Sequence, residues 1–547
     1  MRLVERRIGM LWGLVLLSLL LVLVRATWLG TVRADDLKER ALTQQEEEIT
    51  APARRGVITD RHGVELAVSE DAITVYANPF LIKQPVPLAR RLAPLLGVPE
   101  AEVLEKLADR DTGFVYLARK LDSRRGEEIE ALEVEGIGTV VEPIRRYPQG
   151  FFASQVLGFV GTDNKGLSGL EHAHDETLRG SDGKSRIVKD ALGKPVSLVQ
   201  IERAQPGEDL RLTIDSAIQE RTEAVLADVG ATYRPKGATA VVLDPRNGEV
   251  LALANWPRVD ANDIGGAPEY ARQNRAIEAT YEPGSTFKAF TVAGALSQRL
   301  VTPSSRFDLP PQIQVADRTI GEAHDRGGLN LTVSEILAQS SNVGSVKIGL
   351  LLGKERFDDW VRRFGFGKPT GVGLPGEGSG IVLDPEDYSG SSMGNLPIGQ
   401  GIAVTPMQMA AAYSAIANRG ILHPPRIVAG RGRPPRRVLA AASAEQVSKM
   451  LEGVLATGGT AEEAAVEGYT LAGKTGTAEK VDPETGTYSD SKYVASFIGF
   501  APAEDPRLLV AVMVDEPQGA IYGGVVAAPA FEKIVSFALP YMRIPPR

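Results

Sequence analysis

The strongest hydrophobic pattern in the chain is an uninterrupted apolar run near its start. Residues 8–24 form a seventeen-residue stretch without a charge, and a helix of that length spans roughly 25 Å, near the lower limit for a bilayer. Arg2, Arg6 and Arg7 precede the run and predict a cytoplasmic N-terminus. We expect residues 8–29 to form an uncleaved single-pass anchor. A cleaved signal peptide is the alternative, although its apolar region is usually shorter.

After a polar stalk, expected at residues 30–51, short strand and helix patterns alternate. Residues 56–59 and 64–68 have the composition of strands and flank a turn that contains Gly63, which predicts a β-hairpin. Two helices and one strand are predicted farther on, at residues 88–107, 124–134 and 140–146. This part of the chain therefore resembles a mixed α/β module, and we place its limits at residues 52–206.

From residue 207 onwards the pattern predicts one antiparallel sheet packed against helices. Asn247 and Gly248 are a strong turn signal between the strand patterns at 238–243 and 249–254. Asp215 is expected to cap one helix and Thr405 another. Further helices are predicted at residues 286–298, 332–339, 343–352, 407–418 and 529–538, and further strands at 469–478, 493–500 and 508–514.

The composition of the chain excludes several kinds of catalytic and binding site. The chain has 547 residues, no Cys, five His, and 69 acidic against 61 basic residues, for a net charge of -8. Such a length predicts more than one domain, and the acidic balance argues against nucleic-acid binding. Without Cys there is no thiolate nucleophile and no Cys-bound metal. The scattered His residues make a histidine base improbable for a serine nucleophile.

The residues that best explain a serine-based chemistry are Ser285 and Lys288. They form an S-x-x-K pattern at the predicted start of a helix, where positions i and i+3 share one face. A lysine held out of water beside the hydroxyl can serve as its base. Taken alone, the pattern is more typical of a capping Ser followed by a surface Lys. The same spacing recurs at Ser181 and Ser489, in surroundings that predict a turn and a polar loop.

Two further groups strengthen the interpretation. Ser340 and Asn342 fall between two predicted helices and supply a hydroxyl and an amide. Helix capping is an alternative explanation for both. Lys474, Thr475, Gly476 and Thr477 form a K-T-G-T run on a predicted strand, where hydroxyls can bind a carboxylate, the glycine lets a substrate backbone approach, and the strand edge can pair with a peptide. An ordinary strand end with a surface Lys is the alternative.

The ordered combination of S-x-x-K, S-x-N and K-T-G is typical of β-lactamases and penicillin-binding proteins. With it, the chain resembles the class B penicillin-binding proteins, the monofunctional transpeptidases of bacterial cell walls. Segments similar to that family's pedestal lie at residues 55–63, 145–148 and 169–171, and segments similar to its transpeptidase module at 281–288, 399–401 and 474–477. Residues 495–502, 514–517 and 522–529 resemble the division-specific branch.

This resemblance implies an α+β multidomain fold. A cytoplasmic tail at residues 1–7 and a transmembrane helix would precede an elongated pedestal of the dimerisation type. The transpeptidase domain, residues 207–547, would hold an antiparallel sheet between helices, similar to serine β-lactamases. The catalytic part would then lie on the periplasmic side of the inner membrane, at the division site.

The resemblance also implies roles for individual residues. Ser285 would attack the penultimate D-Ala carbonyl of a stem peptide that ends in D-Ala-D-Ala. Lys288 would take the proton of Ser285, and Ser340, with Lys474 nearby, would pass a proton to the departing D-Ala. Asn342 would orient the peptide amide. No metal and no organic cofactor are expected.

The carboxylate end of the donor is assigned by the same resemblance. Thr475 and Thr477 would hold the terminal carboxylate, and the backbone N–H groups of Ser285 and Thr477 would form the oxyanion hole. An amine of a neighbouring stem peptide would then attack the acyl-enzyme and form the cross-link. A β-lactam would imitate the donor and stay attached.

The implied partners are peptidoglycan stem peptides, β-lactams, a septal glycosyltransferase and other division proteins, with no nucleic acid. Several rival functions share part of this chemistry. A D,D-carboxypeptidase or a β-lactamase would use water as acceptor, and an elongation-specific transpeptidase would differ in its partners. A catalytically silent penicillin sensor or scaffold is the rival from another class. The complete set of predicted catalytic residues argues against it.

Overall fold

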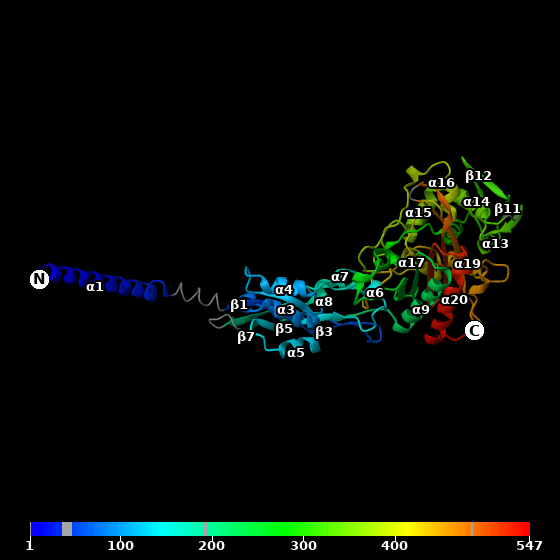
Figure 1. Ribbon diagram of the computed structural model, residues 1–547. Helices are drawn as coiled ribbons and strands as arrows, with labels where there is room; N and C mark the ends of the chain where they lie inside the picture. Colours follow the sequence, from blue (N-terminus) through cyan, green and yellow to red (C-terminus); the bar gives the residue numbers. More distant parts are fainter. Residues whose placement is uncertain are drawn as a thin grey trace. The chain divides into compact units, whose positions relative to one another are not determined.

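The computed structural model describes residues 2–34, 46–189, 195–324, 327–430, 432–482 and 485–546 (Figure 1). Its internal contacts divide the chain into two units. The first unit comprises Met1–Arg55, Glu70–Ile144 and Arg179–Gly207, and the second comprises Gly56–Ser69, Arg145–Leu178 and Glu208–Arg547. Both units are therefore built from segments that are separated in the sequence. Part of the expected stalk, residues 35–45, lies outside the described residues.

Helix α1 (Arg2–Thr31) contains the apolar run. Its segment Glu5–Thr31 has a mean hydropathy of 2.4 over the most apolar window, and no part of that window is buried. In the described part of the chain it is the one helix long and apolar enough to cross a membrane. The predicted helix is confirmed and extends beyond residues 8–29 at both ends.

A small α/β core fills the middle of the first unit. Strand β3 (Glu65–Ala77) pairs with β4 (Val115–Leu121) and with β5 (Ile137–Arg146). Helices α3 (Pro85–Leu96), α4 (Glu100–Ala108) and α5 (Ser123–Glu130) supply the remaining elements. Their apolar faces meet in one cluster around Val75, Leu92, Val103, Leu117 and Ile129, all at most 1% exposed.

Two expectations for the first unit were wrong in detail. The helix predicted at residues 88–107 is two helices, because Gly97 adopts φ +68° at the end of α3 and Pro99 precedes α4. Residues 46–51, expected as stalk, form strand β1 (Glu46–Ala51), because β6 (Gly183–Lys189) supplies an antiparallel partner. Strand β7 (Pro195–Glu202) completes that sheet. Such long-range pairing is not visible in local composition.

The second unit is organised around a five-stranded sheet with the order β10-β9-β19-β18-β17. All neighbouring pairs are antiparallel. The strands are β9 (Gly237–Leu243), β10 (Val250–Trp256), β17 (Ala472–Val481), β18 (Tyr488–Ala501) and β19 (Leu508–Asp515). Every residue of β9 and β19 is buried, which requires that both faces of the sheet are covered. The hairpin predicted at Asn247-Gly248 is confirmed.

Helices α9 (Ser216–Tyr233) and α20 (Ala528–Tyr541) cover one face of this sheet. Phe531 of α20 packs on Phe497 of β18, with the ring centroids 4.6 Å apart. Gly499, on the same face, leaves room for this ring, because a Cβ there would lie 2.9 Å from Phe531 Cζ. The ring of Phe531 therefore fixes how closely α20 approaches the sheet.

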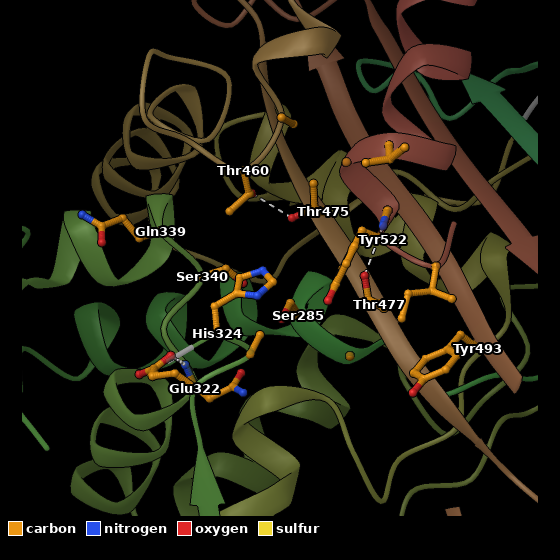
Figure 2. A pocket seen from close by; sticks show the side chains of 18 of the residues that line it. Ser285, Glu322, His324, Gln339, Ser340, Thr460, Thr475, Thr477, Tyr493 and Tyr522 are labelled. Carbon is orange, nitrogen blue, oxygen red and sulfur yellow. Dashed lines mark hydrogen bonds between the residues drawn. The ribbon is translucent and has the colours of Figure 1, made fainter. Parts of the chain in front are cut away.

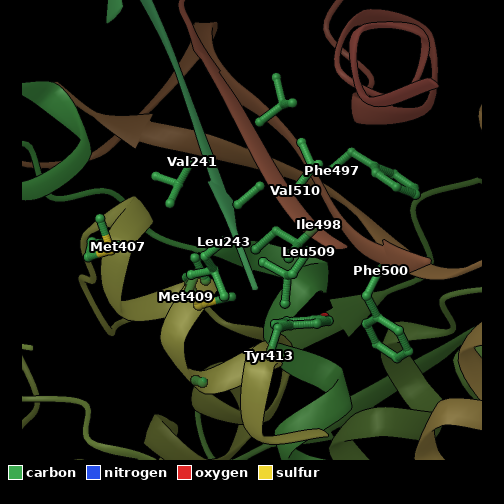
Figure 3. Close-up of a cluster of buried hydrophobic side chains, with 14 of the residues drawn as sticks. Val241, Leu243, Met407, Met409, Tyr413, Phe497, Ile498, Phe500, Leu509 and Val510 are labelled. Atoms are coloured by element: carbon green, nitrogen blue, oxygen red, sulfur yellow. The ribbon is translucent and has the colours of Figure 1, made fainter. Parts of the chain in front are cut away.

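Helices α12 (Lys288–Ser297) and α17 (Pro406–Ala417) lie on the other side. Figure 3 shows Met409 and Tyr413 of α17 among sheet residues such as Leu243, Ile498 and Leu509. Thr405 caps α17 in a capping box with Gln408, as predicted. The expected antiparallel sheet between helices is thus confirmed.

Asp60 links the turn between β2 (Ile58–Thr59) and β3 to α9 within the second unit. Its carboxylate accepts hydrogen bonds from the N–H groups of His62, Val64 and Ser216 and from the Ser216 hydroxyl, at 2.7–3.2 Å. Burial opposes ionisation of Asp60, but these hydrogen bonds outweigh it and hold the pKa below the ordinary value of 3.8. Asp215, one residue before α9, caps that helix as predicted.

We predict that Asp60→Ala lowers the free energy of unfolding by about 2 kcal/mol at pH 7, because it leaves four donors without this acceptor. The pKa of Asp60 is depressed in the folded state, so its contribution is present above pH 3.8 and is lost as the pH falls through the folded value. Denaturant unfolding of both forms at pH 7 and pH 3 measures the difference. An equal difference at the two pH values would contradict this account.

Candidate active site

Ser285 lies at the start of the helix that the sequence predicted, in a tight first turn. The segment Gly284–Phe287 is the 3-10 helix η3, and α12 continues directly from Lys288. Gly284 has φ +53° and a Cβ there would lie 2.9 Å from the carbonyl oxygen of Thr477. Because only glycine fits this close approach, the backbone of Ser285 is held against strand β17.

The buried side of this turn is fixed by aromatic packing. Phe287 contacts Phe290 and Phe366, with ring centroids 5.3 Å and 5.2 Å apart. The hydroxyl of Tyr413, from α17, donates a 2.6 Å hydrogen bond to the carbonyl oxygen of Thr286, and burial raises the pKa of Tyr413. Aromatic packing and the Tyr413 hydrogen bond therefore fix the buried side of the helix start that carries Ser285.

Lys288 connects this helix to the second predicted group. The residue is 0% exposed. Its Nζ donates to the carbonyl oxygen of Ser340 at 2.6 Å, to Ser340 Oγ at 3.3 Å and to Asn342 Oδ1 at 2.6 Å. Ser340 and Asn342, which lie far from Lys288 in the sequence, thus meet at its amine.

Ser340 occupies the turn between α13 (Val333–Ala338) and α14 (Asn342–Leu352). It has φ +60°, an unusual backbone conformation for a residue other than glycine. Such backbone strain persists only where the surrounding structure holds it in place. The hydrogen bond from the Lys288 amine stabilises this conformation. The contacts of Glu322 with the residues that follow Ser340 also stabilise it.

Glu322 was not predicted from the sequence. Its carboxylate accepts hydrogen bonds from Ser341 Oγ at 2.5 Å, from the N–H of Asn342 at 2.9 Å and from the N–H of Val343 at 3.2 Å. A carboxylate at the first N–H groups of α14 is also favoured by the helix dipole. Glu322 therefore fixes the turn that presents Ser340 and Asn342.

The third predicted group lies on β17, an edge strand of the sheet. Lys474 is 0% exposed, and its Nζ donates to Thr475 O at 3.2 Å and to Thr475 Oγ1 at 3.3 Å. Thr475 Oγ1 also lies 2.8 Å from Thr460 Oγ1. Thr477 Oγ1 accepts a hydrogen bond from the N–H of Gly523 at 3.1 Å. Figure 2 shows both threonines directed into the cleft beside Ser285.

Gly476 has a different physical role from the expected one. The sequence argument gave it space for a substrate backbone. A Cβ at Gly476 would instead lie 2.4 Å from Ser496 Oγ, 2.9 Å from Thr286 Cγ2 and 3.0 Å from Pro283 O. The glycine therefore lets β17 pack against the segment that carries Ser285. It brings two parts of the site together and does not face the cleft.

These elements surround a cleft of about 930 Å³. Five of the predicted site residues line it: Ser285, Ser340, Asn342, Thr475 and Thr477. The two lysines lie beneath the surface. The other S-x-x-K pairs lie elsewhere. Ser181 bridges to Gln205, and Ser489 belongs to strand β18 and not to a polar loop before it.

Several other lining residues had no signal in the sequence. The side chains of Thr460 and Glu322 reach the site only because the fold brings separate segments of the chain together. His324 and Tyr522 face each other across the cleft with ring centroids 5.4 Å apart, and Figure 2 shows them on either side of Ser285. An isolated His or Tyr in a loop carries no motif, so local pattern analysis passes over both.

Glu282, three residues before Ser285, is another polar group near the cleft. It accepts hydrogen bonds from the N–H of Gly401 at 3.0 Å and from the hydroxyl of Tyr488 at 3.0 and 3.1 Å. Burial raises the pKa of Glu282, Arg318 lowers it, and the nearby charge of Glu479 raises it further. Burial likewise raises the pKa of Tyr488.

The arrangement has the parts of a covalent acyl-transfer site: a hydroxyl at a helix start, a desolvated lysine, a second hydroxyl and a polar strand edge. A comparison of the chain with models of known protein families agrees with this interpretation. The penicillin binding protein transpeptidase domain matches residues 238–536, and the penicillin-binding protein dimerisation domain matches residues 50–212.

Known proteins resemble the chain over most of its length. Stage V sporulation protein D of Bacillus subtilis is 36% identical, covering 96% of this chain and 84% of that protein. Peptidoglycan D,D-transpeptidase FtsI of Escherichia coli K12 is 34% identical, covering 99% and 92%. The crystal structure of penicillin binding protein 3 from Mycobacterium tuberculosis with aztreonam superposes with a TM-score of 0.73 at 31% identity, covering 91% and 98%.

The chain therefore belongs to the class B penicillin-binding proteins, with a dimerisation domain and a transpeptidase domain. Its activity is that of a peptidoglycan D,D-transpeptidase.

We predict that Glu322→Ala lowers the second-order rate of acylation by a penicillin about tenfold, since hydrogen bonds to a charged group are worth roughly 1.5–3 kcal/mol and their loss releases the Ser340 turn. Stopped-flow labelling with a fluorescent penicillin measures this rate. Glu463→Ala, which removes another carboxylate at the cleft, is the matched control and should stay within about twofold of the wild type. An unchanged rate in Glu322→Ala would contradict the role of the turn.

Proposed function

We propose that Ser285 is the acylated nucleophile of this transpeptidase and that Lys288 is its base. Ser285 Oγ attacks the carbonyl carbon of the penultimate D-Ala, and its proton passes to Lys288 Nζ. The peptide bond to the terminal D-Ala breaks, leaving an ester between D-Ala and Ser285. An acceptor amine then attacks this ester, and Ser285 regains its proton.

Ser340 completes the proton path in this scheme, because the departing D-Ala nitrogen needs a proton. Its hydroxyl lies 3.3 Å from Lys288 Nζ, so a proton taken from Ser285 has a short route to the leaving group. Lys474 supplies positive charge beside the substrate carboxylate, and Asn342 orients the peptide amide. The observation that carries the proposal is the convergence of Ser340 and Asn342 on the buried Lys288 amine.

The donor's terminal carboxylate is proposed to lie at Thr475 and Thr477. Both hydroxyls face the cleft on the edge strand, and Gly476 between them keeps that strand close to Ser285. The backbone N–H groups of Ser285 and Thr477 would stabilise the oxyanion, since the two backbones are brought together at Gly284. No metal or organic cofactor takes part in this scheme.

We predict that a fluorescent penicillin labels the purified full-length protein and that Ser285→Ala abolishes the label, because no ester can form. Denaturing gel electrophoresis of labelled protein measures the adduct. Ser181→Ala, at an S-x-x-K site outside the cleft, is the control and should label as the wild type does. Persistent label on Ser285→Ala would refute the nucleophile assignment, and rapid loss of the adduct would favour a β-lactamase.

We further propose a septal role. Residues 52–206 serve as the pedestal and 207–547 as the transpeptidase domain, which the matched ranges 50–212 and 238–536 support. The apolar helix at Glu5–Thr31 supports a single inner-membrane anchor, with residues 1–7 in the cytoplasm and the cleft on the periplasmic side. The likeness to FtsI supports work at the division site, and we propose a septal glycosyltransferase and other division proteins as partners there. An elongation-specific enzyme is the second candidate.

Depletion of the protein in its native organism separates these two candidates. We expect cells to elongate into filaments without septa, because loss of septal cross-linking stops division but not growth of the side wall. Phase-contrast microscopy after depletion measures cell length. Rounded cells would identify the elongation role. A plasmid copy carrying Ser285→Ala should fail to restore division, whereas Ser181→Ala should restore it.

A further inference from the structure

Strand β17 presents a third cleft-facing residue beyond the two threonines. Side chains alternate along a strand, so Glu479 shares a face with Thr475 and Thr477, and all three line the cleft. Neighbours on this face are about 7 Å apart. Glu479 pairs across the ladder with Tyr493 of β18, which also lines the cleft. The donor-binding edge therefore ends in a carboxylate.

This carboxylate forms no ion pair in the described part of the chain, although Arg318 lies near enough to lower the pKa of the neighbouring Glu282. No hydrogen bond or ion pair involves the Glu479 side chain there, and none of the described cleft-lining residues is Lys or Arg. Glu322, in contrast, is committed to α14, and Glu462 accepts a hydrogen bond from the N–H of Gly458. Glu479 is thus a carboxylate open to the cleft.

Glu479 also lies close enough to Glu282 to influence its ionisation. Burial raises the pKa of Glu282 and that of Tyr493, and the charge of Glu479 adds to both shifts. Like charges at one end of a groove repel each other, and a bound cation relieves that repulsion. Arg318 offsets part of this negative charge, but Glu479, which lines the cleft without an ion pair, is the carboxylate that a cationic group of a ligand can contact.

We propose that Glu479 selects donor peptides whose residue immediately before the acylated D-Ala carries a free ammonium group. The proposal rests on the donor orientation given above, with the terminal carboxylate at Thr475 and Thr477. From that point, the peptide runs back past Ser285 and antiparallel to β17, towards Glu479. A side chain one residue before the acylated D-Ala then comes within reach of the Glu479 carboxylate.

The size of the effect follows from the exposure of the site. Glu479 is partly exposed, and ion pairs in such positions contribute up to about 1 kcal/mol. That corresponds to roughly a fivefold preference for the ammonium-bearing donor. The preference should decrease as salt is raised, because ions screen the pair.

Two synthetic peptides test the inference. Both end in D-Ala-D-Ala and carry Lys before it, one with a free ε-amine and one with the ε-amine acetylated. Each competes with a fluorescent penicillin for acylation of the full-length protein, and the ratio of the two inhibition constants is taken within each variant. A general loss of active sites cancels in that ratio. The same measurement is made for Glu479→Gln and for Glu463→Gln, a cleft carboxylate on the η6 segment (Glu462–Ala464).

The wild type should favour the free amine about fivefold, Glu479→Gln should reduce the ratio to near one, and Glu463→Gln should retain the wild-type ratio. A wild type without preference, or a preference that survives in Glu479→Gln, would overturn the inference. These outcomes are independent of the Ser285→Ala labelling result. If that label persists, the proposed function fails; if only the ratio is unaffected by Glu479→Gln, the function stands and this inference fails.

Discussion

The site depends on one buried amine. Lys288 is enclosed by protein and donates to a carbonyl oxygen, a hydroxyl and an amide oxygen from the Ser340 turn. Burying an amine without hydrogen-bond partners is costly, so the turn and α12 cannot separate without leaving the Lys288 amine unpaired. The unusual backbone of Ser340 is held by the same contact. The spacing of the cleft's two walls is therefore tied to a single side chain.

Local patterns in the sequence predicted those parts of the fold that local chemistry determines. The Asn247-Gly248 turn, the Asp215 cap and the Thr405 capping box all formed where expected, because each is decided within a few residues. The helix predicted at residues 88–107 was wrong because its periodicity continues across Gly97 and Pro99, where the backbone cannot. Strand β1 was missed because its partner is far along the chain.

The same difference between local and long-range determinants applies to the residues of the site. Motif spacing predicted Ser285, Lys288, Ser340 and Asn342 as one group. In the structure Lys288 contacts Ser340 and Asn342, and Ser285 lines the same cleft. Glu322 could not be predicted, since its function exists only when its loop reaches the first turn of α14. The role of Gly476 also depends on contacts that the sequence does not reveal. Only the positions of Thr286, Pro283 and Ser496 show that the glycine serves packing and not the substrate.

Strand β17 forms one edge of the main sheet and lines the cleft. An edge strand that must remain available to a peptide cannot be capped by a neighbouring strand, and such open edges are where chains associate during folding or storage. The backbone at residues 472–476, where a donor would bind, is buried, so extended segments of other molecules reach it only through the cleft. Aggregation resistance in this enzyme consequently comes from this burial and from charges such as Glu479 on the wall of the cleft.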